Sequence, residues 1–169
     1  MIIRLADRSL QTRFGVFDEI LFYDGLSECI ALVMGEVRNE DDVLVRIHSS
    51  CISAHVFNSI ECTCREEMEA AQTLIGQNGR GVVIWLDQEG KGNGHLALIE
   101  SIKYKRQGFD QAEAYVKAGY RKDGRDYRPA ADVLNEIGVR SVILLTDNQK
   151  KADELRDHSI TVSAIRPLD

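Results

Sequence analysis

The chain has 169 residues, of which 44% are hydrophobic and 28% are charged. These proportions exclude a disordered chain, and this length buries enough surface for one core without disulfide bonds, so we expect a single domain over residues 1–169. The apolar runs are far shorter than the ~20 residues that cross a bilayer, and the N-terminus lacks signal-peptide zones, so we expect a cytoplasmic protein without a membrane partner. The net charge of −6 argues against nucleic acid as a partner.

The first half of the chain predicts an antiparallel region and then a helix. We expect strands over residues 12–17, 19–23, 29–34 and 42–48, and a helix over 65–77. The Asp24-Gly25 turn signal between two of these strands favours antiparallel pairing.

The second half alternates strands and helices. We expect strands over 82–86, 139–145 and 160–165, helices over 95–107, 110–118, 129–137 and 148–157, and a polar loop over 119–128. We find no linker and no internal repeat. The fold class is therefore mixed α/β: an antiparallel N-terminal strand region and a mixed sheet flanked by helices.

Three cysteines lie close together in the sequence, at Cys51 and in Cys62-Thr63-Cys64. In an extended Cys-x-Cys segment both sulfurs point to the same side, so the three thiolates can share one Zn²⁺ and leave its fourth position open to water. Two alternatives remain: Cys29, His48 or His55 completes a closed structural site, or these are merely buried thiols.

A glycine-rich turn, 87–94, joins a buried strand to a helix. Its amides can face an anion at the helix N-terminus, with Lys91 supplying charge and Glu89 acting as a polar contact or base. The turn is also compatible with a simple tight connection.

Two further segments concentrate positive charge in this acidic chain. Residues 121–128 carry four cations and two carboxylates around a glycine, which indicates a phosphorylated substrate or, alternatively, a solvated surface loop. Residues 146–151 join a strand end to a helix start, where amides and lysines can hold phosphate, although an ordinary N-cap explains the same pattern.

Together these segments resemble GTP cyclohydrolase II, the zinc enzyme that opens the imidazole ring of GTP at the start of riboflavin synthesis. The matching motifs, in chain order, are Thr12-x-Phe14-Gly15-x-Phe17, Ala31-Leu32-Val33-x-Gly35, Arg46-x-His48-Ser49-x-Cys51, Cys62-x-Cys64, Glu69-Ala70-Ala71, Gly79-Arg80-Gly81, Gln88-Glu89-Gly90, Gln107-Gly108-x-Asp110, Asp123-x-Arg125-Asp126-Tyr127 and Leu144-Leu145-Thr146-x-Asn148-x-x-Lys151. Several motifs in the right order are more specific than any one of them.

The resemblance implies roles for individual residues. It implies a zinc site at Cys51, Cys62 and Cys64, with Asp123 as proton acceptor and Arg125 as the group proposed to attack the α-phosphate. A guanidinium stays protonated, so on physical grounds we expect Arg125 to stabilise the phosphoryl group electrostatically. The implied nucleotide contacts are Arg46, His48, Ser49, Glu89, Gly90, Thr146 and Lys151.

The chain departs from the family pattern at positions near the substrate. Ser50 replaces a glutamate, Glu67 a glutamine, Lys91 an arginine and Gln111 a threonine, and we keep these four among the expected substrate contacts. Ile102 stands where the family has a tyrosine implicated in the ring chemistry, and Tyr104 lies two residues away.

The resemblance implies a zinc-dependent cyclohydrolase that hydrolyses GTP with release of formate and pyrophosphate, with Mg²⁺ on the substrate phosphates. The departures leave two alternatives: the same chemistry on another base such as a uracil nucleotide, or a zinc-stabilised nucleotide-binding module without catalysis. The resemblance also implies a homodimer, for which we expect the apolar strand segments 20–22 and 30–32 to be sheet edges that need cover.

Overall fold

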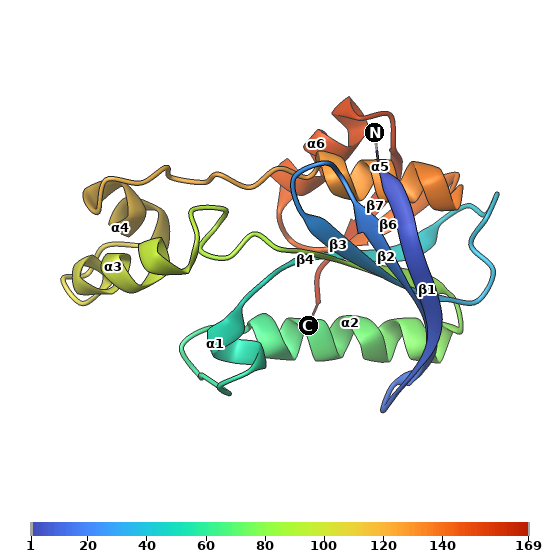
Figure 1. The fold of residues 1–169 in the computed structure, drawn as a ribbon, viewed down its shortest axis with the longest axis horizontal. Coiled ribbons are helices and arrows are strands. Elements are labelled where there is room, and N and C mark those ends of the chain that lie inside the picture. The colour runs from blue at the N-terminus through green and yellow to red at the C-terminus, as the bar shows by residue number, and fades with distance from the viewer. Residues whose placement is uncertain (1, 169) are drawn as a thin grey trace.

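One mixed sheet organises the chain (Figure 1). The computed structural model describes residues 2–168, and its sheet has the order β1-β2-β3-β5-β4-β6-β7. The strands are β1 Ile3–Thr12, β2 Gly15–Tyr23, β3 Glu28–Met34, β4 Val43–Ser49, β5 Gly81–Leu86, β6 Ser141–Leu145 and β7 Thr161–Arg166. Strands β1, β2, β3 and β5 pair antiparallel, whereas β5, β4, β6 and β7 pair parallel. The expected mixed sheet with an antiparallel N-terminal region is confirmed.

Helices cover both faces of this sheet. They are α1 Ile52–His55, α2 Cys64–Asn78, α3 His95–Lys105, α4 Gln111–Lys117, α5 Arg128–Ile137 and α6 Gln149–Asp157. Helix α2 lies on one face, where Ile75 packs with Leu44 and Val83, and α5 and α6 lie on the other, where the core includes Val45 and Ile84 (Figure 1). Consecutive residues of β4, and likewise of β5, therefore pack into the cores on opposite faces of the sheet. Because both faces are buried, the sequences of these strands are continuous apolar runs.

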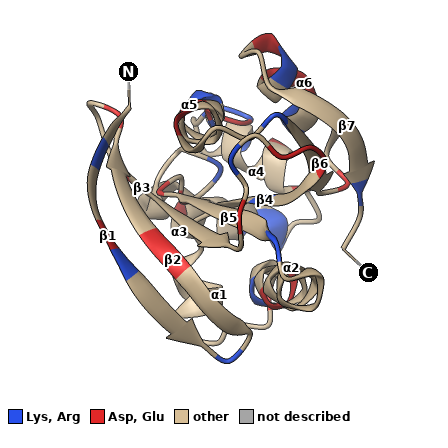
Figure 2. Cartoon of the chain, turned by 90° about the vertical axis from the view of Figure 1, so that its right-hand side faces the viewer, with Lys and Arg blue, Asp and Glu red and all other residues tan. Residues whose placement is uncertain are grey.

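The N-terminal hairpin differs from the expectation. A strand over 12–17 is wrong, because β1 ends at Thr12 and β2 begins at Gly15. The Thr12 hydroxyl donates to the Gly15 carbonyl at 2.8 Å and accepts from the Phe14 amide at 3.1 Å, which closes the turn. Strand β1 was not predicted from the sequence. It is an edge strand that is exposed along most of its length and carries charged residues (Figure 2), so its sequence shows no apolar alternation.

The expected sheet edges are also wrong. Residues 20–22 lie in β2 and 30–32 in β3, and both strands have neighbours on two sides, whereas the edges are β1 and β7. The apolar residues of these segments serve the core: Phe22 and Ala31 are fully buried.

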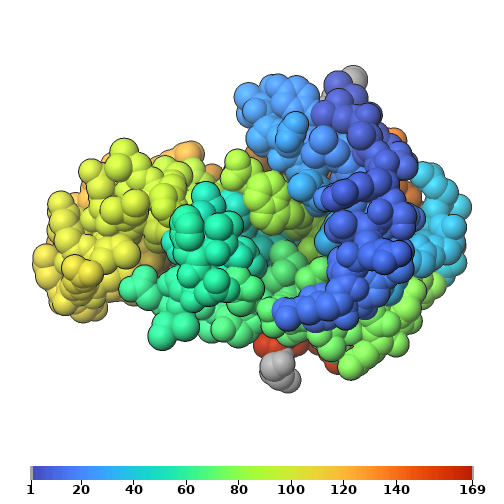
Figure 3. Space-filling model, turned by 60° about the horizontal axis from the view of Figure 1, so that its bottom comes forward, coloured from blue at the N-terminus to red at the C-terminus, as the bar shows by residue number. Residues whose placement is uncertain are grey.

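Helices α3 and α4 form a lobe, residues 95–117, that extends away from the sheet (Figures 1 and 3). Asp110 begins α4 as a capping box, accepting from the Glu113 amide at 2.8 Å. The other helices and strands predicted in the second half occur within about two residues of their expected bounds. Among residues 2–168, no helix is long and apolar enough to cross a membrane.

Gly76 on α2 offers a test of how tightly the helix packs on the hairpin. A Cβ at this position would lie 2.5 Å from the Phe14 carbonyl oxygen. Helix propensity alone would make alanine more stable than glycine here by about 1 kcal/mol. The clash of its Cβ with the Phe14 backbone outweighs this gain, so we expect alanine to be destabilising. We expect Gly76→Ala to lower the free energy of unfolding by about 1–2 kcal/mol in urea titrations. The exposed neighbour variant Gln77→Ala should change it by less than about 0.5 kcal/mol; a stabilised Gly76→Ala would contradict this packing.

Candidate active site

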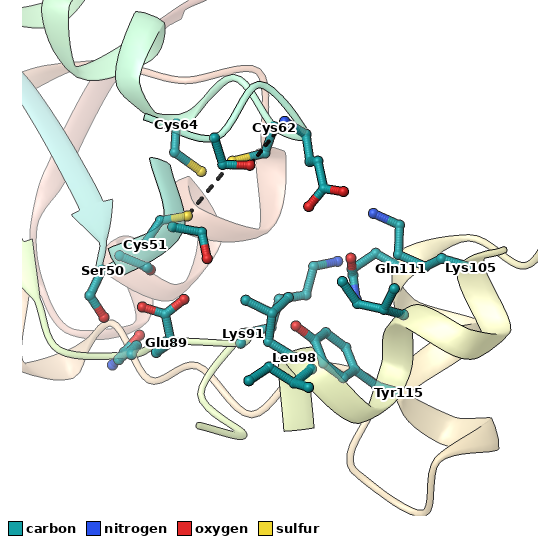
Figure 4. Close-up of a pocket in the computed structure, with 18 of the residues that line it drawn as sticks. Ser50, Cys51, Cys62, Cys64, Glu89, Lys91, Leu98, Lys105, Gln111 and Tyr115 are labelled. Atoms are coloured by element: carbon teal, nitrogen blue, oxygen red, sulfur yellow. Dashed lines mark hydrogen bonds between the residues drawn. The ribbon is translucent and has the colours of Figure 1, made fainter. Parts of the chain in front are cut away.

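A pocket of about 410 Å³ lies between the carboxyl ends of β4 and β5 and the α3–α4 lobe (Figure 4). Most of the residues expected from the sequence line it together. These are Ser49, Ser50, Cys51, Cys62, Cys64, Glu89, Gly90, Lys91, Gln111 and Arg125. Segments far apart in the sequence therefore meet in one cavity, as Figure 4 shows for the cysteines, the glycine-rich turn and α4.

The three thiols form a cluster that fits zinc. The Sγ atoms of Cys51 and Cys62 are 3.7 Å apart, and those of Cys51, Cys62 and Cys64 all lie within 4.8 Å of one another. Tetrahedral Zn–S bonds of about 2.3 Å require sulfurs about 3.8 Å apart. Within residues 2–168, no histidine, carboxylate or further cysteine joins this cluster, so Cys29 and the histidines do not complete a closed site.

The cluster forms for a different reason than expected. The segment Cys62-Thr63-Cys64 is not extended: Thr63 is the N-cap of α2, with φ −96° and ψ 12°, and Cys64 is the first helical residue. Arg65 donates to the carbonyls of Ala54 at 3.0 Å and His55 at 2.6 Å, which holds the segment after Cys51 against the start of α2.

Burial raises the pKa of the Cys51 and Cys64 thiols, and the neighbouring Cys62 raises both further. Thiolates packed this closely repel one another in the absence of a cation. A divalent metal reverses this, because a coordinating thiol is deprotonated outright. The chemistry of the donor set therefore also fits Zn²⁺.

The glycine-rich turn is tied to the cysteine segment. Glu89 is 8% exposed, and its Oε2 accepts from the Ile52 amide at 2.9 Å, next to Cys51. The Ser50 hydroxyl donates to Asp87 at 3.1 Å. Glu89 is thus committed to holding the two loops together, which favours a positioning role for its carboxylate.

Asp123 and Arg125 form a bidentate ion pair. Nε and Nη2 of Arg125 donate to the two Asp123 oxygens at 3.0 and 2.6 Å. Although burial opposes it, these hydrogen bonds lower the pKa of Asp123. Arg125 lines the pocket, whereas Asp123 faces an adjoining groove that it shares with Lys91, Lys122 and Lys150.

The remaining expected residues form a polar cluster beside the pocket, buried except for Glu67. Arg46 pairs with Glu67 and donates to the Leu145 carbonyl at 2.9 Å, and Lys151 donates to the Ile47 carbonyl at 3.1 Å. Burial, followed by Arg46, lowers the pKa of Lys151 to about 8. These cations thus sit at the carboxyl ends of β4 and β6.

Two of the expected nucleotide contacts have protein partners. Thr146 accepts from the Asn148 amide at 3.1 Å, and Asn148 caps α6, so the N-cap explanation holds for this motif. His48 lies 2.9 Å from His55 between their Nε2 atoms, and burial lowers its pKa to about 3, which keeps it neutral.

Several polar atoms near these cations have no partner among residues 2–168. They are Nε of Arg46, Oγ of Ser49 and the hydroxyl of Tyr127, all of them buried. The Tyr127 ring lies beneath two cations, 5.7 Å from the Arg125 guanidinium carbon and 5.6 Å from Lys151 Nζ. Buried polar atoms are nearly always paired, so these orphans indicate a place for a polar ligand.

Tyr115 is a pocket residue that the sequence did not predict. It lines the pocket from α4, together with Ile102 from α3, whereas Tyr104 does not line it. Tyr115 follows Gln111 by four residues, so both lie on one face of α4, and that spacing is the signal that identifies it.

Sequence and fold comparisons with known proteins show the family of this chain. The riboflavin biosynthesis proteins RibBA of Bacillus cereus and Endomicrobium trichonymphae are 38% and 35% identical over 170 residues; the matches cover 99% of this chain but only 43% and 42% of those proteins. The chain thus spans less than half their length. The fold resembles RibBX, a two-domain 3,4-dihydroxy-2-butanone 4-phosphate synthase from A. baumannii, at a TM-score of 0.54 and 17% identity, over 97% of this chain and 40% of that one. Because the GTP cyclohydrolase II model matches residues 3–167, the chain belongs to the GTP cyclohydrolase II family.

Proposed function

We propose that this chain is a zinc-dependent hydrolase that opens the imidazole ring of GTP, with release of formate and pyrophosphate, in riboflavin biosynthesis. The observation that carries the proposal is the single pocket in which three clustered thiols face Arg125 and the glycine-rich turn. The family match and the RibBA relatives support the same reaction.

The cysteine cluster supports a metal-assisted ring opening. Cys51, Cys62 and Cys64 would hold Zn²⁺, and the bound metal would supply an activated water for hydrolysis at neutral pH. Within the chain, Glu89 holds the Cys51 segment against the glycine-rich turn. The pocket wall of Leu98, Ile99 and Ile102 gives a heterocyclic base an apolar surface and excludes water.

The cations beside the pocket suit the phosphate end of the substrate. Arg125, oriented by Asp123, presents a fork of donors to a phosphoryl group and stabilises its negative charge. The adjoining groove carries three lysines, Lys91, Lys122 and Lys150. We propose that the phosphates lie along this path, accompanied by Mg²⁺, and that the Asp123 carboxylate accepts a proton.

We further propose that the domain covers residues 1–169, works as a homodimer and acts in the cytoplasm. The free thiols of all four cysteines suit a reducing compartment.

The proposal is tested with zinc-loaded protein and Mg²⁺, offered GTP, GMP, UTP and UMP while formate, pyrophosphate and product mass are followed. We expect a diaminopyrimidine from GTP alone. Product from a uracil nucleotide instead would show that the enzyme opens a different base. A nucleotide-dependent rise in Tm without product would indicate a binding module.

The role of zinc is tested with one cysteine variant and a matched control. Cys64→Ser should lose zinc and ring opening together, because it removes one of three ligands. Cys29→Ala, in the buried core of β3, should keep both. Full ring opening by metal-free Cys64→Ser would contradict the zinc mechanism.

The ion pair yields a second prediction. Asp123→Asn keeps the shape of the side chain but removes the proposed proton acceptor and the charge that orients Arg125, so we expect kcat to fall by about 10²- to 10⁴-fold. Asp126→Asn is the control, since its carboxylate is exposed and pairs with Arg128 at 3.4 Å. Steady-state kinetics on both variants measure the effect; equal rates would remove Asp123 from the mechanism.

A third prediction concerns pH. Burial, and then the charges of Arg46 and Arg125, lower the pKa of Lys151 to about 8, while the charges of Glu67 and Asp147 act in the opposite direction. Its charge is therefore lost as pH rises through about 8, so GTP affinity should fall above that pH, by at most tenfold per pH unit. Calorimetric titrations should show a flatter profile for Lys151→Arg, which stays charged, and an unchanged one for Lys150→Arg. A wild-type profile without this fall would exclude Lys151 from binding.

A further inference from the structure

The pocket wall made by the α3–α4 lobe presents few polar groups. Leu98, Ile99 and Ile102 are apolar, and the Gln111 amide donates to the Ser101 hydroxyl at 3.0 Å. Lys105 is exposed at the rim. On this wall, the group that is both deep in the protein and uncommitted is the hydroxyl of Tyr115.

The Tyr115 ring is held rigidly. The side chain is 1% exposed and is among the largest fully buried ones. Within residues 2–168, its hydroxyl has no hydrogen-bond partner, although the side chain lines the pocket. The packing of the ring would be served equally by phenylalanine, so the hydroxyl needs another explanation.

The hydroxyl lies over the glycine-rich turn. A Cβ placed on Gly90 would lie 3.4 Å from the phenolic oxygen, so the absence of a side chain there keeps the space around the hydroxyl open. Figure 4 shows Tyr115 across the cavity from Cys51, Cys62 and Cys64. A flat base in the pocket would lie between the two.

The surroundings keep this hydroxyl a donor. Burial, and then the Glu89 carboxylate, raise the pKa of Tyr115 to about 12. A neutral phenol carries one O–H to donate, and its donation is strongest to an acceptor that gains negative charge.

We propose that Tyr115 contacts the substrate: its hydroxyl donates a hydrogen bond to an oxygen or nitrogen of the nucleotide base, from the side of the pocket opposite the three thiols. This inference rests on the proposed function, since it takes a nucleotide base as the occupant. Tyr115 thereby supplies a hydroxyl on the wall where Ile102 brings none.

The first test is kinetic. Tyr115→Phe keeps the ring and removes the hydroxyl, so we expect kcat/KM for GTP to fall by about 10- to 100-fold, because a bound acceptor is left unpaired. Tm and zinc content should match the wild type. The control Tyr104→Phe, which removes a hydroxyl from the same lobe outside the pocket, should stay within about twofold. Wild-type kinetics for Tyr115→Phe, or a loss of zinc or Tm that accounts for its defect, would overturn the proposal.

The second test does not depend on turnover. With 3-fluorotyrosine at position 115, the ¹⁹F signal of the zinc-loaded protein should shift on saturation with GTP, whereas the same label at position 104 should not respond. An unchanged signal at 115 would overturn the contact. If no nucleotide yields product but the signal at 115 shifts, the proposed ring opening fails while the contact stands, so the two failures are distinguishable.

Discussion

The parallel pairing of β4 with β5 is the constraint on which the site depends. Their register ends at Ser49 opposite Leu86, and the Ser50 amide continues the ladder to the Leu86 carbonyl at 2.8 Å. The cysteine segment and the glycine-rich turn therefore leave the sheet side by side. The buried hydrogen bond from the Ile52 amide to Glu89 then fixes one loop against the other. The carboxyl ends of parallel strands are where open α/β sheets bind ligands, and this sheet follows that rule.

The opposite wall of the pocket is positioned by loops. The lobe of α3 and α4 is joined to the sheet through the glycine-rich turn and through the loop of residues 121–128, and these two segments hydrogen-bond to each other. The Gly124 amide donates to the Lys91 carbonyl at 2.8 Å, and the Asn93 side chain donates to the Arg121 carbonyl at 2.9 Å. These loop–loop hydrogen bonds thus help to place the lobe that carries Tyr115 relative to the thiols.

Buried cations in an acidic protein give the site its charge. Arg46 and Lys151 are less than a tenth exposed, and strand-end carbonyls take up one donor of each. Burial, and then repulsion by Arg46, lower the pKa of Lys151, and within residues 2–168 Arg46 Nε and the Tyr127 hydroxyl have no hydrogen-bond partner. An anionic ligand would accept hydrogen bonds from the unpaired donors, and its negative charge would offset the repulsion between the cations. Helix α6 carries Lys151 to this position because Asn148 caps it directly after β6.

The sequence by itself determined the mixed α/β class, the helices after the cysteines and after Pro129, and the zinc-binding residue types, because apolar periodicity, caps and thiol chemistry are local properties. It could not place β1, whose exposed edge position leaves no alternation, nor the sheet order that puts β5 between β3 and β4. Only the tertiary structure divided the expected residues between the pocket and a buried cluster beside it, and only it brought Tyr115 to the wall facing Cys51. Such contacts join residues some 60 positions apart, and no local pattern records them.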